Sequence, residues 1–373
     1  MDVAQRLIDR GYRSYMTGFS ALDKYYGLES TGILSLAAET DLVGISSLFE
    51  DVRYPSIGEA DILVEGHDTH TQYLIQALEE GRAPYGRLRH TSFWFDFSKR
   101  TYQDPLGIYP DLRKPGMLDI PSTSEMGSTS PWAVAADAAV LVARYGFTID
   151  DAQVERLSQY GKKHPALLAP MEQQLLIKRL STSKDPAKGL IMLDNCGFIR
   201  THWPLIASMK GVEQDKDFHP EGDVWEHTLE TFSHLKQPDL GVFLALLLHD
   251  CGKAFSSPSG KNRFDRHAQI GASRAKRFLQ GLEFHESLVD QVVFLVKEHM
   301  LPSLISKLPV YRTEQVMEHP AFSDLLEVYR CDVSSAFYGL DGYYKACEIY
   351  RRYLRHKRNP FRGNDGKQRR SYG

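Results

Sequence analysis

Histidine and aspartate side chains occur at five places in the C-terminal half of the chain, each within a stretch that otherwise reads as an apolar helix. The stretches are VWEHTLETF with His227, LLLHDCGK with His249 and Asp250, FDRHAQIGA with His267, FLVKEHM with His299, and VYRCDVSSAF with Asp332. Imidazole and carboxylate groups are costly to bury unless something pairs with them. The ordered set therefore predicts a metal centre at which these side chains converge.

The donor types indicate which metals would bind. Mixed imidazole and carboxylate ligands favour the divalent transition metals Mn, Fe, Ni, Co or Zn, whereas Mg, which remains possible, prefers oxygen ligands. One or two ions are expected, because Asp250 has a second carboxylate oxygen that can bridge to another ion. Such an ion lowers the pKa of a bound water. Lys253 would balance the charge of a phosphate, so the predicted catalytic residues are Asp250 and Lys253.

Gly252 separates these two residues in the sequence HDCGK. Helices often end with a glycine in the left-handed conformation, because glycine has no Cβ to clash there. We therefore expect Gly252 to end the apolar helix with a left-handed turn.

The composition is that of a globular protein of two or three domains. The 373 residues are 42% hydrophobic and carry a net charge of −3. The four cysteines form no CxxC pair, which favours reduced thiols. The N-terminal residues MDVAQRLIDRGYR contain no apolar signal segment, and the longest apolar run, LGVFLALLL, is shorter than a membrane span. We expect a cytoplasmic protein without a membrane segment.

The pattern of elements changes once along the chain. Residues 1–131 mix strand-like pieces (GILSLAA, ADILVEG and TSFWFDFS) with a helical one, THTQYLIQALEEG. From Trp132 onward nearly every segment reads as helix. The predicted fold is an α+β N-terminal domain over 1–131, followed by all-α regions over 132–215 and 216–355. A basic flexible tail is expected over 356–373, and the chain is mainly α overall.

The sequence segments around the histidines resemble those of a known family. EGDVWEHTLETF, LALLLHDCGKA, DRHAQIGA and LVKEHM are similar to the HD superfamily of metal-dependent phosphohydrolases, in the form attached to bacterial tRNA nucleotidyltransferases (CCA-adding enzymes and poly(A) polymerases). VARYGFTID and LLIKRLSTSKDPAKGLIMLDNCGFI resemble that family's helical, RNA-binding neck. The resemblance implies a nucleotidyltransferase-like head over 1–131, a neck over 132–215 and an HD domain over 216–355. It also implies 2′,3′-cyclic phosphates, 2′-nucleotides or RNA-end phosphates as substrates.

The head departs from the family pattern at the positions that do its chemistry. In YMTGFSALDKYYGL, Gly18 and Asp23 match the family, but Phe19 and Leu22 stand where it has a second glycine and an arginine. The acidic pair that holds two magnesium ions should follow in GILSLAAET, which has no carboxylate before Glu39. The resemblance therefore implies a head whose transferase site is inactive.

A different segment can be matched to the acidic-pair strand of the family, and this match would retain the transferase function. EADILVEG offers Glu59 and Asp61 as an acidic pair, which predicts magnesium-dependent addition of nucleotides to tRNA ends. The arginines that read the incoming base should lie on WAVAADAAVLVARYGF, where Arg144 alone remains.

A third reading is a non-catalytic RNA-binding protein with a structural metal. It is supported by the neck and by a basic C-terminal region whose candidate RNA contacts are Arg351, Arg352, Arg355, Lys357 and Arg358. The partner would be a tRNA-like RNA or a nucleotide phosphoester. The sequence leaves the oligomeric state open.

Overall fold

The protein forms two compact units, Met1–His202 and Trp203–Gly373. The computed structural model describes residues 3–66, 71–164, 166–214, 222–256, 258–259, 263–336 and 339–358. The predicted head and most of the predicted neck lie together in the first unit. Its boundary at His202 precedes the expected end of the neck at residue 215.

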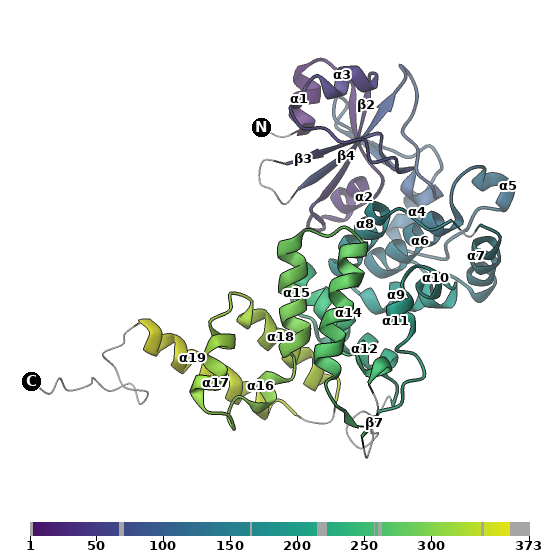
Figure 1. The fold of residues 1–373 in the computed structure, drawn as a ribbon. Coiled ribbons are helices and arrows are strands. Elements are labelled where there is room, and N and C mark those ends of the chain that lie inside the picture. The colour runs from purple at the N-terminus through teal and green to yellow at the C-terminus, as the bar shows by residue number, and fades with distance from the viewer. Residues whose placement is uncertain are drawn as a thin grey trace, which may run out of the picture. The chain divides into compact units, whose positions relative to one another are not determined.

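A six-stranded mixed sheet forms the centre of the N-terminal part of the first unit (Figure 1). Its order is β3-β4-β2-β1-β5-β6, in which β2 and β4 are parallel and the other neighbours antiparallel. The strands are β1 (Ser14–Thr17), β2 (Ile33–Glu39), β3 (Ile62–Glu65), β4 (Gln72–Leu78), β5 (Trp94–Asp96) and β6 (Thr101–Gln103). The accompanying helices are α1 (Val3–Asp9), α2 (Gly18–Tyr26), α3 (Leu42–Ser46), η1 (Arg89–Thr91), α4 (Tyr109–Arg113) and α5 (Thr123–Met126).

Strand β4 corrects one prediction, because its segment was expected to be helical. β4 is paired on both edges, with β2 and β3, and packs on both faces. Ile75 belongs to the core beneath α1, which includes Leu7, whereas Leu74 packs on the opposite face with Leu175. A strand buried on both faces shows a continuous apolar run rather than alternation, so periodicity does not distinguish it from a helix.

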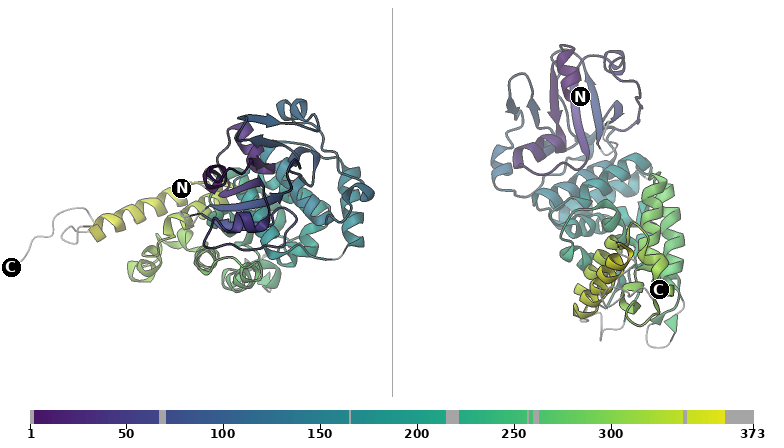
Figure 2. Two further views of the ribbon diagram at one scale, coloured as in Figure 1. Left: turned by 90° about the horizontal axis from the view of Figure 1, so that it is seen from above. Right: turned by 90° about the vertical axis from the view of Figure 1, so that its left-hand side faces the viewer.

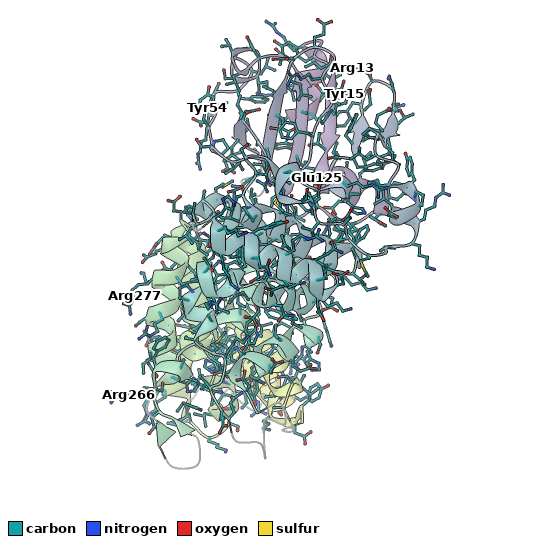
Figure 3. All side chains as sticks on the ribbon, turned by 90° about the vertical axis from the view of Figure 1, so that its right-hand side faces the viewer. Arg13, Tyr15, Tyr54, Glu125, Arg266 and Arg277 are labelled. Atoms are coloured by element: carbon teal, nitrogen blue, oxygen red, sulfur yellow. The ribbon has the colours of Figure 1, made fainter. Side chains whose placement is uncertain are left out.

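Polar side chains of β1 and β2 meet at one position of this sheet. The Tyr15 hydroxyl donates to Glu39, and the Arg13 guanidinium lies 5.6 Å from the Tyr15 ring and 3.2 Å from Asp96 (Figure 3). Burial and the Glu39 hydrogen bond raise the pKa of Tyr15, so the phenol stays protonated as the donor. Glu39, the first carboxylate of β2, is thereby engaged by its own sheet neighbours.

Helices complete the first unit as predicted. They are α6 (Pro131–Tyr145), α7 (Asp151–Lys163), α8 (Pro170–Ser181), α9 (Pro186–Asn195) and α10 (Phe198–His202). All of α6 is buried, and its alanines let a neighbour approach closely: a Cβ at Gly189 would lie 3.0 Å from both Ala139 O and Ala143 Cβ. The alanine-rich sequence of α6 therefore serves close packing.

Arg144 is fixed by buried contacts and joins α6 to α2. Its Nε lies 2.7 Å from Asp23 Oδ1, and its other guanidinium nitrogens donate to the carbonyl oxygens of Thr182 and Glu29 at 2.6 Å. Tyr145 donates to the same Asp23 oxygen at 2.7 Å. The one arginine of α6 expected to read a base is therefore a structural anchor.

Replacing Arg144 by methionine will lower the free energy of unfolding by about 3–5 kcal/mol, because Asp23 is left buried without its counter-charge. Urea denaturation followed by circular dichroism measures the change. The control is Arg82→Met, whose exposed pair with Glu79 is worth about 0.5 kcal/mol. Equal losses in the two variants would contradict the anchor role.

His202 gives the first unit a pH-dependent contribution to stability. Its Nε2 accepts from Leu168 N at 3.1 Å, its ring stacks on Phe198, and burial lowers its pKa from 6.5 to about 4. In the unfolded chain this histidine therefore binds a proton at a higher pH than it does in the folded protein. This contribution is therefore complete above pH 6.5 and is lost as the pH falls toward 4.

The His202→Gln variant will have a flatter stability–pH curve than the wild-type protein over that range. We expect the two free energies of unfolding to diverge by up to about 3 kcal/mol between pH 7 and pH 4. Chemical denaturation at a series of pH values measures this difference. Parallel curves would show that His202 does not titrate between the two states.

In its described residues the second unit is mainly helical, with a short hairpin whose strands are β7 (Pro258–Ser259) and β8 (Arg263–Phe264). Its helices are α11 (Pro204–Ala207), α12 (Val224–Thr231), η2 (Phe232–His234), α13 (Leu240–Leu248), η3 (Lys253–Phe255), α14 (His267–Gly281), α15 (Glu286–Glu298), α16 (Leu301–Leu304), α17 (Val310–Met317), α18 (Phe322–Ser334) and α19 (Asp341–Arg358). α13 packs against α15 and α18 and is buried on all sides from Gly241 onward. The predicted fold class, α+β followed by all-α, is confirmed.

Within the described ranges, no helix has both the length and the apolar content that crossing a membrane requires. The helix of residues 341–358 is the longest of the second unit, and it is strongly charged. Its C-terminal part projects beyond α16, α17 and α18 (Figures 1 and 2).

The basic C-terminal residues that the structure describes are helical, so the expectation of a flexible tail from residue 356 is wrong for 356–358. Arginine and lysine favour helix, and charged pairs one turn apart support it. Arg352 pairs with Glu348 at 2.6 Å, and Lys357 pairs with Glu318 at 3.1 Å. Arg351 and Arg355 are exposed on α19, and Arg358 is its last residue. Residues 359–373 of the expected tail lie outside the described residues.

Candidate metal centre

The apolar helix α13 ends at the centre of the second unit, and two polar residues follow it. His249 and Asp250 are 1% and 2% exposed. The structure brings all six predicted ligands together in two groups: His227, His249 and Asp332, and Asp250, His267 and His299. In each group the ligand atoms lie within 4.8 Å of one another.

Asp250 lies between the two groups. Its Oδ2 is 3.3 Å from His249 Nε2, and its Oδ1 is 3.5 Å from His267 Nε2 and 3.8 Å from His299 Nε2. One carboxylate oxygen is thus directed to each group. This is the geometry expected of a carboxylate that bridges two cations, and it also permits a single ion in either group.

The second group contains two imidazole nitrogens whose lone pairs face each other. His267 Nδ1 lies 2.8 Å from Phe264 O and His299 Nδ1 lies 2.7 Å from Val296 O. A carbonyl only accepts, so in both rings Nδ1 carries the proton. The two Nε2 atoms are 3.1 Å apart. Burial lowers the pKa of His299 to about 4, so a shared proton is disfavoured at neutral pH and a cation fits better.

The first group has the same character. His249 Nδ1 lies 2.8 Å from Leu246 O, and its buried Nε2 has no hydrogen-bond partner among the described residues. The Ser335 hydroxyl donates to Asp332 O at 2.7 Å and lies 3.3 Å from His227 Nδ1. His227 Nε2 lies 3.0 Å from Asp332 Oδ1, within hydrogen-bond distance of that carboxylate. Both groups therefore fit divalent transition-metal ions.

Lys253 supplies a positive charge beside the ligands. Its Nζ lies 2.6 Å from Asp250 Oδ2, and it also donates to Gln214 Oε1. Burial alone would raise the pKa of Asp250, but Lys253 and His249 hold it well below its usual range. The carboxylate is therefore ionised at neutral pH and ready to bind a cation.

Gly252 is needed for a close approach and not for a left-handed turn, so that prediction is wrong. Its φ is −73°, which any residue can adopt. A Cβ at this position would lie 2.0 Å from His267 O and 2.6 Å from Gly271 N. Gly252 thus lets the chain after α13 touch the start of α14, which brings Asp250 to His267.

Arg266 precedes His267 in a left-handed conformation, with φ of +61°. A non-glycine residue there costs on the order of 1 kcal/mol and persists only when its surroundings enforce it. Its side chain lies at the surface of the second unit (Figure 3). The turn makes His267 the first residue of α14. The spacing of the histidines and aspartates in the sequence predicts neither this left-handed turn at Arg266 nor the contact between Ser335 and His227.

A cavity of about 390 Å³ opens onto the ligands and is contained within the second unit. The predicted residues that line it are Asp250, Lys253, His267, His299 and Asp332. Side chains that sequence reasoning missed form the rest of the wall. They include Met300, Ser303, Tyr329 and Val333, beside Gly339 and Gly342.

The alternative acidic pair in the first unit is engaged in other contacts. Glu59 pairs with Arg179 and lies 3.8 Å from Arg87. Burial would raise the pKa of Glu59, but these arginines lower it. Asp61 Oδ2 accepts from Ala77 N at 2.9 Å. Among the described residues, no group of three or more metal-ligand side chains occurs in the first unit.

Comparison with known protein families gives a match in the second unit, which holds both ligand groups. A family model described as "HD domain" matches residues 224–332. The chain thus contains a segment that matches the HD domain, and it is similar to CCA-adding tRNA nucleotidyltransferases. A CC-adding tRNA nucleotidyltransferase of Thermus thermophilus is 33% identical over 172 residues, which is 43% of this chain and 39% of that protein. A multifunctional CCA protein of Neisseria gonorrhoeae is 32% identical over 170 residues, covering 44% and 41%.

The matched segments span about two-fifths of these curated relatives. A solved structure, the Bacillus stearothermophilus CCA-adding enzyme in complex with CTP, covers 96% of this chain and 81% of its own. Its TM-score is 0.52 at 16% identity. This likeness shows a shared fold over most of the chain.

The HD domain should bind Mn²⁺ or Co²⁺, and a His249→Ala variant should lose at least about tenfold in affinity, because one imidazole donor is removed. Isothermal titration calorimetry of metal-free protein measures this. The control is His234→Ala, since His234 lies outside both groups. A metal also raises the melting temperature by binding only the folded state. Unchanged affinity in the His249 variant would exclude this centre.

Proposed function

We propose that the HD domain is a metal-dependent phosphohydrolase that acts on nucleotide or RNA-end phosphoesters such as 2′,3′-cyclic phosphates. The observation that carries the proposal is the pair of neighbouring ligand groups, of which Asp250, His267, His299 and Asp332 line one cavity together with Lys253. When bound, a divalent transition metal supplies a water of lowered pKa and polarises phosphoryl oxygens.

The residues of the chain support this chemistry in distinct ways. Three backbone carbonyls hold His249, His267 and His299 with their Nε2 atoms directed inward, so no reorganisation of these rings is needed on binding. Lys253 reaches the cavity and can donate to an oxygen of a bound phosphate while remaining close to Asp250. We assign Asp250 and Lys253 as the catalytic residues of the proposed reaction.

Nucleotides and RNA ends are the substrates that the remaining observations favour. The cavity volume lies within the range of small-molecule sites, about 300–1,000 Å³. One curated relative is named as a CC-adding tRNA nucleotidyltransferase. On α19, the exposed Arg351 and Arg355 would contact phosphates of an RNA, together with Arg352, Lys357 and Arg358, and the reaction would take place in the cytoplasm.

We propose further that the head does not transfer nucleotides. Ser35 and Ala37 are two residues apart on β2 and so share one face of the strand, at the place where the acidic pair was expected. Glu59 is neutralised by Arg87 and Arg179, so magnesium would have to displace two arginines to bind it. The similarity to CCA-adding enzymes is the observation that favours the alternative, a transferase that uses Glu59 and Asp61.

One experiment compares the two functions in full-length protein. We expect turnover of 2′,3′-cyclic AMP with Mn²⁺, Ni²⁺ or Co²⁺, and less with Mg²⁺. Asp250→Ala should reduce kcat by at least about 10³-fold, because both ligand groups lose an oxygen. Asp61→Ala is the matched control, and nucleotide addition to tRNA is assayed in the same samples.

No turnover with any of these metals, in protein shown to be folded, would refute the hydrolase. Nucleotide addition that depends on Asp61 and not on Asp250 would establish the transferase in its place.

A further inference from the structure

The rest of the cavity wall is built by the same elements that hold the ligands. Tyr329 precedes Asp332 by three residues on α18, so both lie on one face of that helix. Met300 follows His299 directly, and Ser303 lies one turn further along α16. All line the cavity, yet Tyr329, Met300 and Ser303 have no part in the proposed hydrolysis.

Tyr329 carries a polar group at this wall that its surroundings leave available. The residue is 8% exposed, and among the described residues its hydroxyl has no hydrogen-bond partner. The first turn of α19 passes close to it, since a Cβ on Gly342 would lie 2.7 Å from the hydroxyl oxygen. Gly342 has no positive φ, so glycine serves here to leave space beside the hydroxyl and not to shape the backbone.

Met300 gives the wall its apolar part. Met300 is 46% exposed, although methionine is usually buried, and it lines the cavity. A thioether and a phenol ring both make favourable contacts with flat aromatic faces. The Ser303 and Tyr329 hydroxyls add hydrogen-bonding groups at the same wall.

We propose that Tyr329, Met300 and Ser303 form the subsite that holds the nucleoside of the substrate, while the ligand side of the cavity and Lys253 hold its phosphate. This inference rests on the proposed function and names what the site selects. The substrate is a phosphoester attached to a nucleoside, and a small phosphoester without a base is a poor one. Tyr329 is the specificity-determining residue, because it supplies both an aromatic face and a hydroxyl.

The test compares two substrates with the same five-membered cyclic diester, in full-length protein loaded with Mn²⁺. They are 2′,3′-cyclic AMP and glycerol 1,2-cyclic phosphate, which lacks the sugar ring and the base. The wild-type protein should prefer cyclic AMP by at least about 100-fold in kcat/KM, since stacking alone contributes on the order of tenfold per base.

Tyr329→Leu should raise KM for cyclic AMP about tenfold with kcat changed less than about twofold, and should leave the glycerol substrate unaffected. Gly342→Ala should act in the same direction, because the new methyl group crowds the hydroxyl. The control is Tyr311→Leu, an exposed tyrosine of α17 outside the cavity, which should match the wild type.

An equal loss on both substrates in the Tyr329 and Gly342 variants would overturn the subsite and leave a structural role for Tyr329. So would a wild-type protein that does not discriminate, although it would still support the hydrolase. If neither substrate is turned over, the proposed function fails, and equilibrium binding of 2′-AMP against glycerol 2-phosphate decides the subsite. A preference for 2′-AMP that is lost in Tyr329→Leu supports it, and equal binding excludes it.

Discussion

The orientation of three imidazole rings is the constraint on which the second unit depends. A carbonyl three residues earlier holds each of His249, His267 and His299 through Nδ1, and so directs Nε2 toward Asp250. Without a cation, the Nε2 lone pairs and the carboxylate oxygens of Asp250 would repel one another there. Helix α13 must be apolar on every side to carry these groups to the centre of the unit, and Gly252 must lack a Cβ for α14 to approach.

The two units deal with buried charge in opposite ways. In the first, each buried acid has an arginine close by: Asp23 has Arg144, and Glu59 has Arg179. The opposite charges in these pairs neutralise each other and stabilise the fold, so these acids offer no site to a cation. In the second unit the acids outnumber the cations that reach them. Incomplete neutralisation therefore favours the binding of a cation in the second unit.

How much the sequence predicted depended on the physical origin of each feature. The ligand set was predictable because buried histidines and aspartates on apolar helices are costly, and α6 was predictable from its length and its alanines. β4 was not, because partners on both edges and both faces determine its conformation. The role of Gly252 depends on a helix distant in sequence, and Tyr329 gives no signal, since a tyrosine on a helix face is ordinary in a core.

Lys253 has a consequence for how the centre exchanges its metal. Its ammonium group already lies on Asp250, so the folded chain carries an internal cation at the bridging carboxylate. A cation that bound at Asp250 would replace one positive charge by another at this carboxylate. The ammonium group of Lys253 would then be available to an incoming anion, so that metal binding and preparation for substrate would be coupled at this side chain.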